Sequence, residues 1–276
     1  MTVKQDYGTC SVSVDAPVAT VTITPPARLE GGTSDLHWDL GEIFSELRGD
    51  NSLRVIVLTG SNGEFYRPRE AAFYDNPELR RYVSDPEGAW KTFTGILRCH
   101  QQMCEIEKPI VARVPGPALG FGSSLVLACD LIVAVADALI VDIHMGMGET
   151  EEGGPAFGIV PGDGGGALAP LFFPPTLAKE FLMLGKRFTA QDLAERGIVN
   201  HAVPEAELDA KVDEIVQALL RRSSFALAWT KRIANRRVAD QLNIALDASA
   251  AYEMVNFLQL DRLGGEDPRT LDGSAV

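Results

Sequence analysis

The sequence predicts an α/β fold built on a parallel sheet, and three observations lead to this prediction. Short β-branched runs alternate with segments of helical periodicity along most of the chain. Such alternation implies right-handed β-α-β crossovers, and no repeat period indicates a solenoid. With 276 residues, 46% of them hydrophobic and 23% charged, the chain has the composition of an ordinary globular protein with a large core.

The N-terminal part should open with an antiparallel hairpin. Residues 11–14 and 18–23 both alternate apolar with polar side chains, and Ala16-Pro17 between them marks a bend. A helical period over 35–47 then leads into 54–60, a β-branched run of the kind buried on both faces of a sheet. The expected order is therefore hairpin, helix and buried strand.

The middle of the chain repeats the pattern of strand, helix and strand. Residues 109–114 form a second apolar run, and a Gly-rich turn over 116–122 leads into a helix that continues through Cys129. A further strand is expected over 131–136. From Leu177 onward the signals are helical.

Charge and apolar patterning exclude two classes of partner. The formal net charge of -13 and the pI near 4.8 argue against nucleic acid, whose binding depends on Lys and Arg at the phosphates. A membrane span is not expected, because the longest apolar stretch, 131–141, is short and interrupted by Asp137. The four cysteines form no CxxC pair, so free thiols in a reducing cytosol are expected rather than disulfides or zinc. These observations favour a cytoplasmic enzyme.

The stretch 158–166, GIVPGDGGG, is the most informative segment of the chain. It places one carboxylate, Asp163, in backbone with almost no side chains, directly ahead of the apolar run 167–173. Glycines allow a close approach of the backbone to a ligand, and the helix macrodipole favours a charged Asp at this place. Asp is also a preferred N-cap residue, so the segment predicts either a catalytic carboxylate or a helix cap.

Four segments together resemble the crotonase superfamily, which is the enoyl-CoA hydratase/isomerase superfamily. They are SLRVIVLTG at 52–60, KPIVARVPGPALGFGSSLVLACD at 108–130, GIVPGDGG at 158–165 and FTAQDLAERGIVNHAV at 188–203. The resemblance implies a spiral of ββα units in a core over 1–203. It also implies a helical region over 204–276 that supports a homotrimer or a dimer of trimers.

The resemblance further implies an oxyanion hole made of two backbone N–H groups. By alignment these belong to Arg69 and Phe121, and the second falls where a helix begins after Gly120. Backbone donors aimed at a developing negative charge are worth roughly 2.7–4 kcal/mol each. Such a site would stabilise an enolate.

Two departures from the family pattern bear on the chemistry. Ser124 occupies the position of the first hydratase glutamate, and a serine is a poor acid or base near neutral pH. The position of the second hydratase glutamate falls in an insertion within 144–158. Residues 67–70, RPRE, replace the small residues that many members place beside CoA. Simple hydratase activity and CoA dependence are therefore both in question, and no cofactor is expected.

The chain resembles most closely the 6-oxocamphor hydrolase type of crotonase, which cleaves a C–C bond of a cyclic β-diketone without CoA. GIVPGDG is shared with that type and places Asp163 on its catalytic aspartate. The same resemblance implies that His37, His144 and Glu253 are active-site residues. Each also has a structural interpretation: a helix surface for His37, an inserted loop for His144 and a solvated helix face for Glu253. The acids at 149–152 predict an exposed loop or lid rather than a metal site.

Three function classes follow. The first is a hydrolase of C–C bonds, a retro-Claisen enzyme acting on a small β-diketone-like carbonyl substrate held in the oxyanion hole. The second is a hydratase or isomerase that binds an acyl-CoA and uses Asp163 as its main proton carrier. The third is a member of the fold that has lost chemistry and acts in binding or assembly, as Ser124 in the glutamate position would allow.

Overall fold

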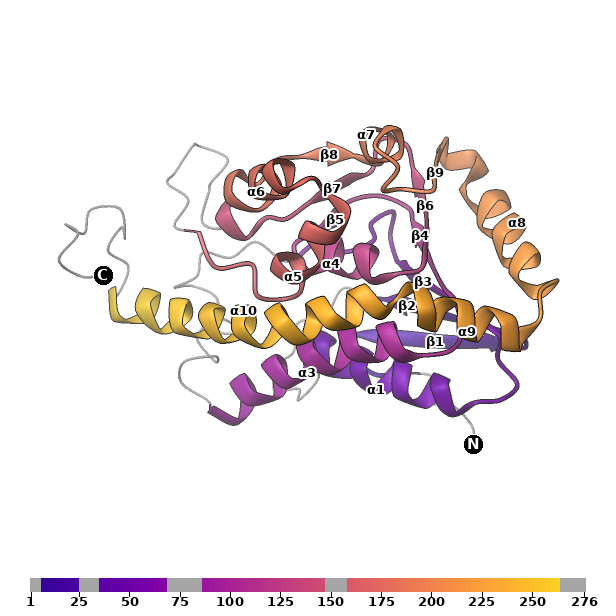
Figure 1. Cartoon of the computed structure of the whole chain (residues 1–276), viewed down its shortest axis with the longest axis horizontal. Coiled ribbons are helices and arrows are strands. Elements are labelled where there is room, and N and C mark those ends of the chain that lie inside the picture. The colour runs from indigo at the N-terminus through magenta and orange to yellow at the C-terminus, as the bar shows by residue number, and fades with distance from the viewer. Residues whose placement is uncertain (1–5, 25–34, 69–85, 147–157, 264–276) are drawn as a thin grey trace.

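A computed structural model describes residues 6–24, 35–68, 86–146 and 158–263 (Figure 1). Within these residues the strands form two sheets. The main sheet has the order β1 (Cys10–Asp15), β2 (Val18–Ile23), β3 (Val55–Gly60), β4 (Ile110–Val114), β6 (Leu131–Val135) and β9 (His201–Val203). The small sheet has the order β5 (Ala118–Leu119), β7 (Leu139–Val141) and β8 (Phe188–Thr189).

Helices cover these sheets and extend beyond them. The helices that precede residue 200 are α1 (Leu36–Gly49), α3 (Pro86–Glu105), α4 (Phe121–Ala128), α5 (Gly165–Phe172), α6 (Pro175–Leu184) and α7 (Ala190–Glu195). They are followed by α8 (Leu208–Leu220), α9 (Ser224–Ala234) and α10 (Arg236–Leu263). In Figure 1, α1 and α3 lie side by side below the main sheet, and α10 runs along most of the length of the molecule.

The predicted hairpin and buried strands are confirmed. Strands β1 and β2 pair antiparallel, with Val12 opposite Val21, and every further pair of neighbours in the main sheet is parallel. All six residues of β3 are buried, which is why residues 55–58 form an unbroken apolar run rather than alternating with polar residues. The helix predicted over 35–47 is α1, and Asp35 is its N-cap.

The fold is the spiral of ββα units expected of a crotonase. One unit is β4, β5 and α4, and the next is β6, β7 and α5, with the first strand of each in the main sheet and the second in the small sheet. The turn predicted over 116–122 is therefore only partly a turn, since it contains β5. Strands β5 and β7 are parallel neighbours. Their carboxyl ends consequently lie at the same edge of the small sheet.

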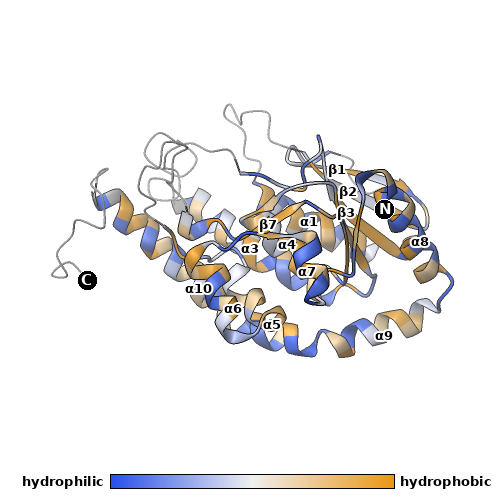
Figure 2. Ribbon diagram, turned by 90° about the horizontal axis from the view of Figure 1, so that it is seen from above, coloured by the Kyte–Doolittle hydropathy of each residue, from blue (hydrophilic) through white to orange (hydrophobic). Residues whose placement is uncertain are grey.

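The C-terminal helices are attached to the core by polar and apolar contacts. Helix α10 packs against α5 and α3, and Lys231 of α9 donates to Asp130 at 2.7 Å. Figure 2 shows hydrophilic and hydrophobic residues alternating along α10. The division at residue 203 stays a prediction.

Large apolar side chains are exposed on the last two helices. They include Phe225, Trp229, Ile233, Ile244, Tyr252 and Val255. Apolar patches of this kind are typical of surfaces that bind a partner. The homotrimer or dimer of trimers stays a prediction, which these side chains favour. No helix among the described residues is long and apolar enough to cross a membrane.

The four cysteines, Cys10, Cys99, Cys104 and Cys129, are buried and unpaired, as their sequence context predicts.

Candidate active site

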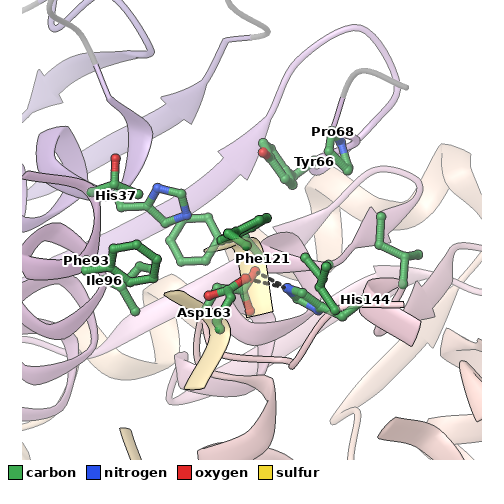
Figure 3. Close-up of a pocket in the computed structure, with 14 residues that line it drawn as sticks. His37, Tyr66, Pro68, Phe93, Ile96, Phe121, His144 and Asp163 are labelled. Atoms are coloured by element: carbon green, nitrogen blue, oxygen red, sulfur yellow. Dashed lines mark ion pairs between the residues drawn. The ribbon is translucent and has the colours of Figure 1, made fainter. Parts of the chain in front are cut away.

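One pocket collects the predicted catalytic side chains (Figure 3). Its volume is about 120 Å³. A cavity of roughly 10–15 Å³ is enough to hold one water molecule, so a small ligand or several waters fit here. His37, His144, Asp163 and Glu253 line it together with the ring of Phe121. Its apolar wall comes from Phe93, Ile96, Ile143, Ile159 and Phe257.

The fold explains how residues far apart in sequence meet here. Phe121 follows β5 and His144 follows β7, and the carboxyl ends of these parallel strands share one edge. Asp163 lies two residues before the start of α5, and α10 brings Glu253 to the same place because it packs on α5. His37 enters from the first turn of α1. The pocket therefore lies where the small sheet, α1, α5 and α10 converge.

His144 lies between carboxylates on both sides of its ring. Its Nδ1 is 2.7 Å from Oδ1 of Asp142, which also accepts the backbone N–H of His144 at 3.1 Å. Its Nε2 is 3.2 Å from Oδ2 of Asp163 and 3.7 Å from Oε1 of Glu253. Burial lowers the pKa of His144, but the charges of Asp163 and Asp142 outweigh it and hold this pKa well above its usual value. His144 is therefore an imidazolium near neutral pH.

Asp163 uses both carboxylate oxygens inside the protein. Oδ2 faces His144, and Oδ1 accepts a hydrogen bond of 3.0 Å from the hydroxyl of Ser124. Burial raises the pKa of Asp163, but the charge and hydrogen bond of His144, helped by Ser124, lower it below its usual value. The alternative of a helix cap is wrong, because the N-cap of α5 is Gly164, which makes no side-chain cap bond.

Glu253 differs from Asp163 in its protonation. Burial raises the pKa of Glu253 to about 8, with the charge of His144 opposing this rise and those of Asp163 and Asp142 adding to it. The side chain is buried, so the expectation of a solvated helix face is wrong for this residue. At neutral pH the site thus holds a carboxylic acid next to an ion pair.

His37 is oriented by a carboxylate of its own. Its Nδ1 is 3.1 Å from Oδ1 of Asp35, and its ring packs on Phe121 with 4.2 Å between ring centroids. The second oxygen of Asp35 accepts the Thr92 hydroxyl. With Nδ1 bound to Asp35, Nε2 is the ring nitrogen left for a ligand.

The glycines of 158–166 make room for side chains of the site. A methyl group on Gly162 would overlap Oε2 of Glu253, and one on Gly165 would overlap Oδ2 of Asp142. That oxygen of Asp142 has no hydrogen-bond partner among the described residues. The close approach predicted for this segment is therefore made to carboxylates of the protein itself.

One of the two predicted oxyanion donors lies among the described residues. Phe121 is the first residue of α4, after Gly120 with φ of 55°. A helix leaves its first N–H groups without intrahelical partners, so the N–H of Phe121 is free of the helix ladder, and its role as an oxyanion donor stays a prediction. Arg69 lies outside the described residues, as do the acids at 149–152.

The surroundings of the pocket carry little positive charge besides the histidines. None of its described lining residues is Lys or Arg. Arg67, which the family resemblance places beside the CoA position of many members, pairs with Glu64 at 2.8 Å. No group of His, Cys, Asp or Glu among the described residues is arranged to hold a metal ion.

Three residues of the site were missed by the sequence prediction. They are Asp142, Asp35 and Thr92, and the sequence also gave no partner for Ser124. The two aspartates had a signal, because each stands two residues before a histidine as Asp-x-His. Thr92 had none, since it reaches Asp35 from 57 positions away.

The chain matches the family model described as enoyl-CoA hydratase/isomerase over residues 13–261. It therefore belongs to that family.

Relatives with this fold differ in activity. The carnitinyl-CoA dehydratase of Shigella flexneri is 31% identical over 196 residues, which cover 71% of this chain and 69% of that protein. A solved enoyl-CoA hydratase/isomerase from Mycobacterium paratuberculosis is similar with a TM-score of 0.76, 28% identity and coverage of 91% and 94% of the two chains. A solved beta-diketone hydrolase from Anabaena has the same TM-score of 0.76 at 23% identity, with coverage of 92% and 96%. At that identity the last likeness shows the fold alone.

Proposed function

We propose that this protein hydrolyses a C–C bond of a small β-diketone and releases one half as an enolate. The observation that carries the proposal is the convergence of His144, Asp163 and Glu253 on one apolar pocket, which Phe121 at the start of α4 also lines. An ion pair, a protonated acid and a backbone donor are the groups that a retro-Claisen hydrolysis needs.

The protonation states of the three side chains suit an attack by water. His144 and Glu253 are both protonated at neutral pH, so Asp163 is the member of the three that can accept a proton. The proton from water enters the Asp163–His144 pair, which titrates as a unit. The hydroxide so formed adds to one carbonyl carbon of the diketone.

The next step breaks the C–C bond between that carbon and the central carbon. The bonding electrons move onto the second carbonyl, which becomes an enolate oxygen, and a backbone N–H at the start of α4 stabilises it. Glu253 donates its proton to the enolate carbon. The products are a carboxylic acid and a ketone, which form one keto acid when the diketone is cyclic, and the proton taken from water later returns to Glu253.

The pocket favours a neutral substrate over an anionic one. Its described wall is largely apolar and lacks Lys and Arg, while Asp163 brings a negative charge. The fold is compatible with this chemistry, since one solved neighbour is a beta-diketone hydrolase.

A panel of cyclic β-diketones in heavy-oxygen water tests the proposal. We expect a keto acid that carries one heavy oxygen in its carboxylate, detected by mass spectrometry. The Asp163→Asn protein serves as the control for background hydrolysis. If no diketone is opened faster than in that control, the proposal fails.

A second candidate is a CoA-dependent dehydratase or hydratase. It is favoured by the 31% identity to carnitinyl-CoA dehydratase. Ser124 opposes it, because the hydroxyl is bound to Asp163 and cannot replace the glutamate of a hydratase. Calorimetry with acetyl-CoA and crotonyl-CoA distinguishes the two: affinity tighter than roughly 100 µM, about −5.5 kcal/mol, would favour this candidate. Turnover of either substrate class would exclude a purely binding role.

A further inference from the structure

Ser124 and Asp163 form the end of a chain of four buried side chains. Asp142 contacts Nδ1 of His144 at 2.7 Å, Nε2 of His144 contacts Oδ2 of Asp163 at 3.2 Å, and Ser124 donates to Oδ1 of Asp163 at 3.0 Å. His144 and Asp163 line the pocket, whereas Ser124 is fully buried behind it. Among the described residues, Ser124 therefore acts on the site through its hydrogen bond to Asp163.

We infer that Ser124 is a positioning residue that fixes the orientation of the Asp163 carboxylate. A carboxylate held by one contact can rotate about its Cβ–Cγ bond. A second donor on its other oxygen prevents this rotation. With Ser124 on Oδ1, Oδ2 stays directed at His144 and at the pocket. The position that holds a proton carrier in hydratases thus holds an orienting hydroxyl here.

Helix α4 ties this orientation to the proposed oxyanion donor. Phe121 is the first residue of α4, and Ser124 stands three positions later on the same helix face. One short rigid helix thereby fixes both the N–H of Phe121 and the contact to Asp163. The oxyanion and the group that activates water are then positioned relative to each other by one helix and by one hydrogen bond from that helix to Asp163.

The neighbouring serine provides a matched control. Ser123 is on the same helix, is equally buried and also donates one hydrogen bond, but to the carbonyl oxygen of Gly120 at 2.8 Å. Replacing either serine by alanine removes one hydroxyl from the interior of α4. Only Ser124→Ala changes a contact of Asp163.

The first test needs no substrate. The ionised Asp163 is favoured in the folded protein, so it stabilises the fold above its unfolded pKa, and this stability is lost as the pH falls through its folded pKa. Without the Ser124 hydroxyl that folded pKa rises toward the unfolded value, so the part of the stability that depends on ionised Asp163 becomes smaller. We therefore expect the deficit in melting temperature of Ser124→Ala relative to the wild type to be largest near pH 7 and to shrink as the pH falls to 3. Any deficit of Ser123→Ala should stay the same across this pH range.

The second test uses turnover and rests on the proposed function. Loss of a buried hydrogen bond to a charged group predicts roughly tenfold lower kcat in Ser124→Ala with KM nearly unchanged. In an Asp163→Asn background the same substitution should change kcat by less than about twofold, because two residues of one unit are not additive. If no diketone is turned over, the pH dependence of the stability difference still decides the role of Ser124.

Three results would overturn the inference. They are a deficit of Ser124→Ala that does not change with pH, the same pH dependence in Ser123→Ala and Ser124→Ala, or the same pH-dependent deficit in the presence of Asp163→Asn.

Discussion

Two Asp-x-His pairs in this protein have the same local geometry and different surroundings. In both, Oδ1 of the aspartate accepts the backbone N–H of the histidine and contacts its Nδ1. From Oδ1 of Asp35, the backbone nitrogen of His37 is 3.0 Å away and its Nδ1 is 3.1 Å away. From Oδ1 of Asp142, the corresponding distances to His144 are 3.1 Å and 2.7 Å. The motif therefore orients a histidine and fixes which ring nitrogen faces the pocket.

The second nitrogen makes the difference between the two pairs. Nε2 of His144 faces Asp163 and Glu253, whereas the ring of His37 packs on Phe121. The pair at His144 is thus part of a cluster of ionisable groups with Asp163 and Glu253. The pair at His37 presents one nitrogen to a largely apolar pocket. The same motif can therefore hold a charged histidine or a single oriented ring nitrogen. Which of the two results depends on whether the fold places carboxylates next to Nε2.

The largest effect is expected where the cluster loses its proton acceptor. Asp163→Asn keeps the shape of the side chain and removes its charge, which should lower turnover by roughly 10²–10⁴-fold. Because Asp163 pairs with His144 and is not a helix cap, the substitution should also lower the pKa of His144. Turnover and an NMR titration of His144 measure the two effects. An Asn variant that keeps more than half of the wild-type turnover would remove Asp163 from the mechanism.

The second prediction removes the orienting carboxylate from the cluster. Asp142→Asn keeps an acceptor for the backbone of His144 but ends the charged contact to Nδ1, so turnover should fall by roughly 10²-fold or more. Asp142 is fully buried beside Gly165, so the melting temperature must be recorded with the rate. A loss of stability without a loss of turnover per folded molecule would make Asp142 a structural residue.

The third prediction concerns the protonated acid. The pKa of Glu253 is raised to about 8 by burial, so the donor form is present below that pH and is lost above it. Turnover should therefore fall about tenfold per pH unit above this value. Glu253→Gln should lower the plateau roughly tenfold or more and remove this alkaline limb. A limb that persists in Glu253→Gln would belong to another group, with His144 the first to test.

The sequence allowed the fold to be predicted more fully than the site. Strand β3 was predictable because residues 55–58 form an unbroken apolar run, and the cap of α7 because Thr189 and Asp192 form a capping box. By contrast, no local pattern brings Glu253 to Asp163 across 90 positions; the family resemblance placed it there. Asp142 was within reach of a sequence argument, since it repeats the Asp-x-His spacing of Asp35. The role of the Ser124 hydroxyl required the packing of α4 against α5.

The smallest effect is expected at the other Asp-x-His pair. Asp35 caps α1 by accepting the N–H groups of His37 and Trp38, and Asn caps a helix about as well as Asp. Asp35→Asn should therefore leave the protein folded near neutral pH. Burial raises the pKa of Asp35, but the contacts from His37 and Thr92 lower it below its usual value. The ionised carboxylate thus stabilises the fold above its unfolded pKa, and this contribution, which is lost on acidification, should be missing in the variant.

The effect of Asp35→Asn on turnover tests whether His37 takes part in the reaction. A histidine that contacts the substrate through Nε2 depends on the carboxylate at Nδ1, so kcat should fall by about three- to tenfold, well below the loss in Asp142→Asn. His37→Phe is the matched variant, because it keeps an aromatic ring against Phe121 and removes both nitrogens. If His37 participates, His37→Phe should be at least as slow as Asp35→Asn. Wild-type kcat and KM in both variants would mean that His37 contributes only its ring to the wall, and that the chemistry belongs to the His144 cluster alone.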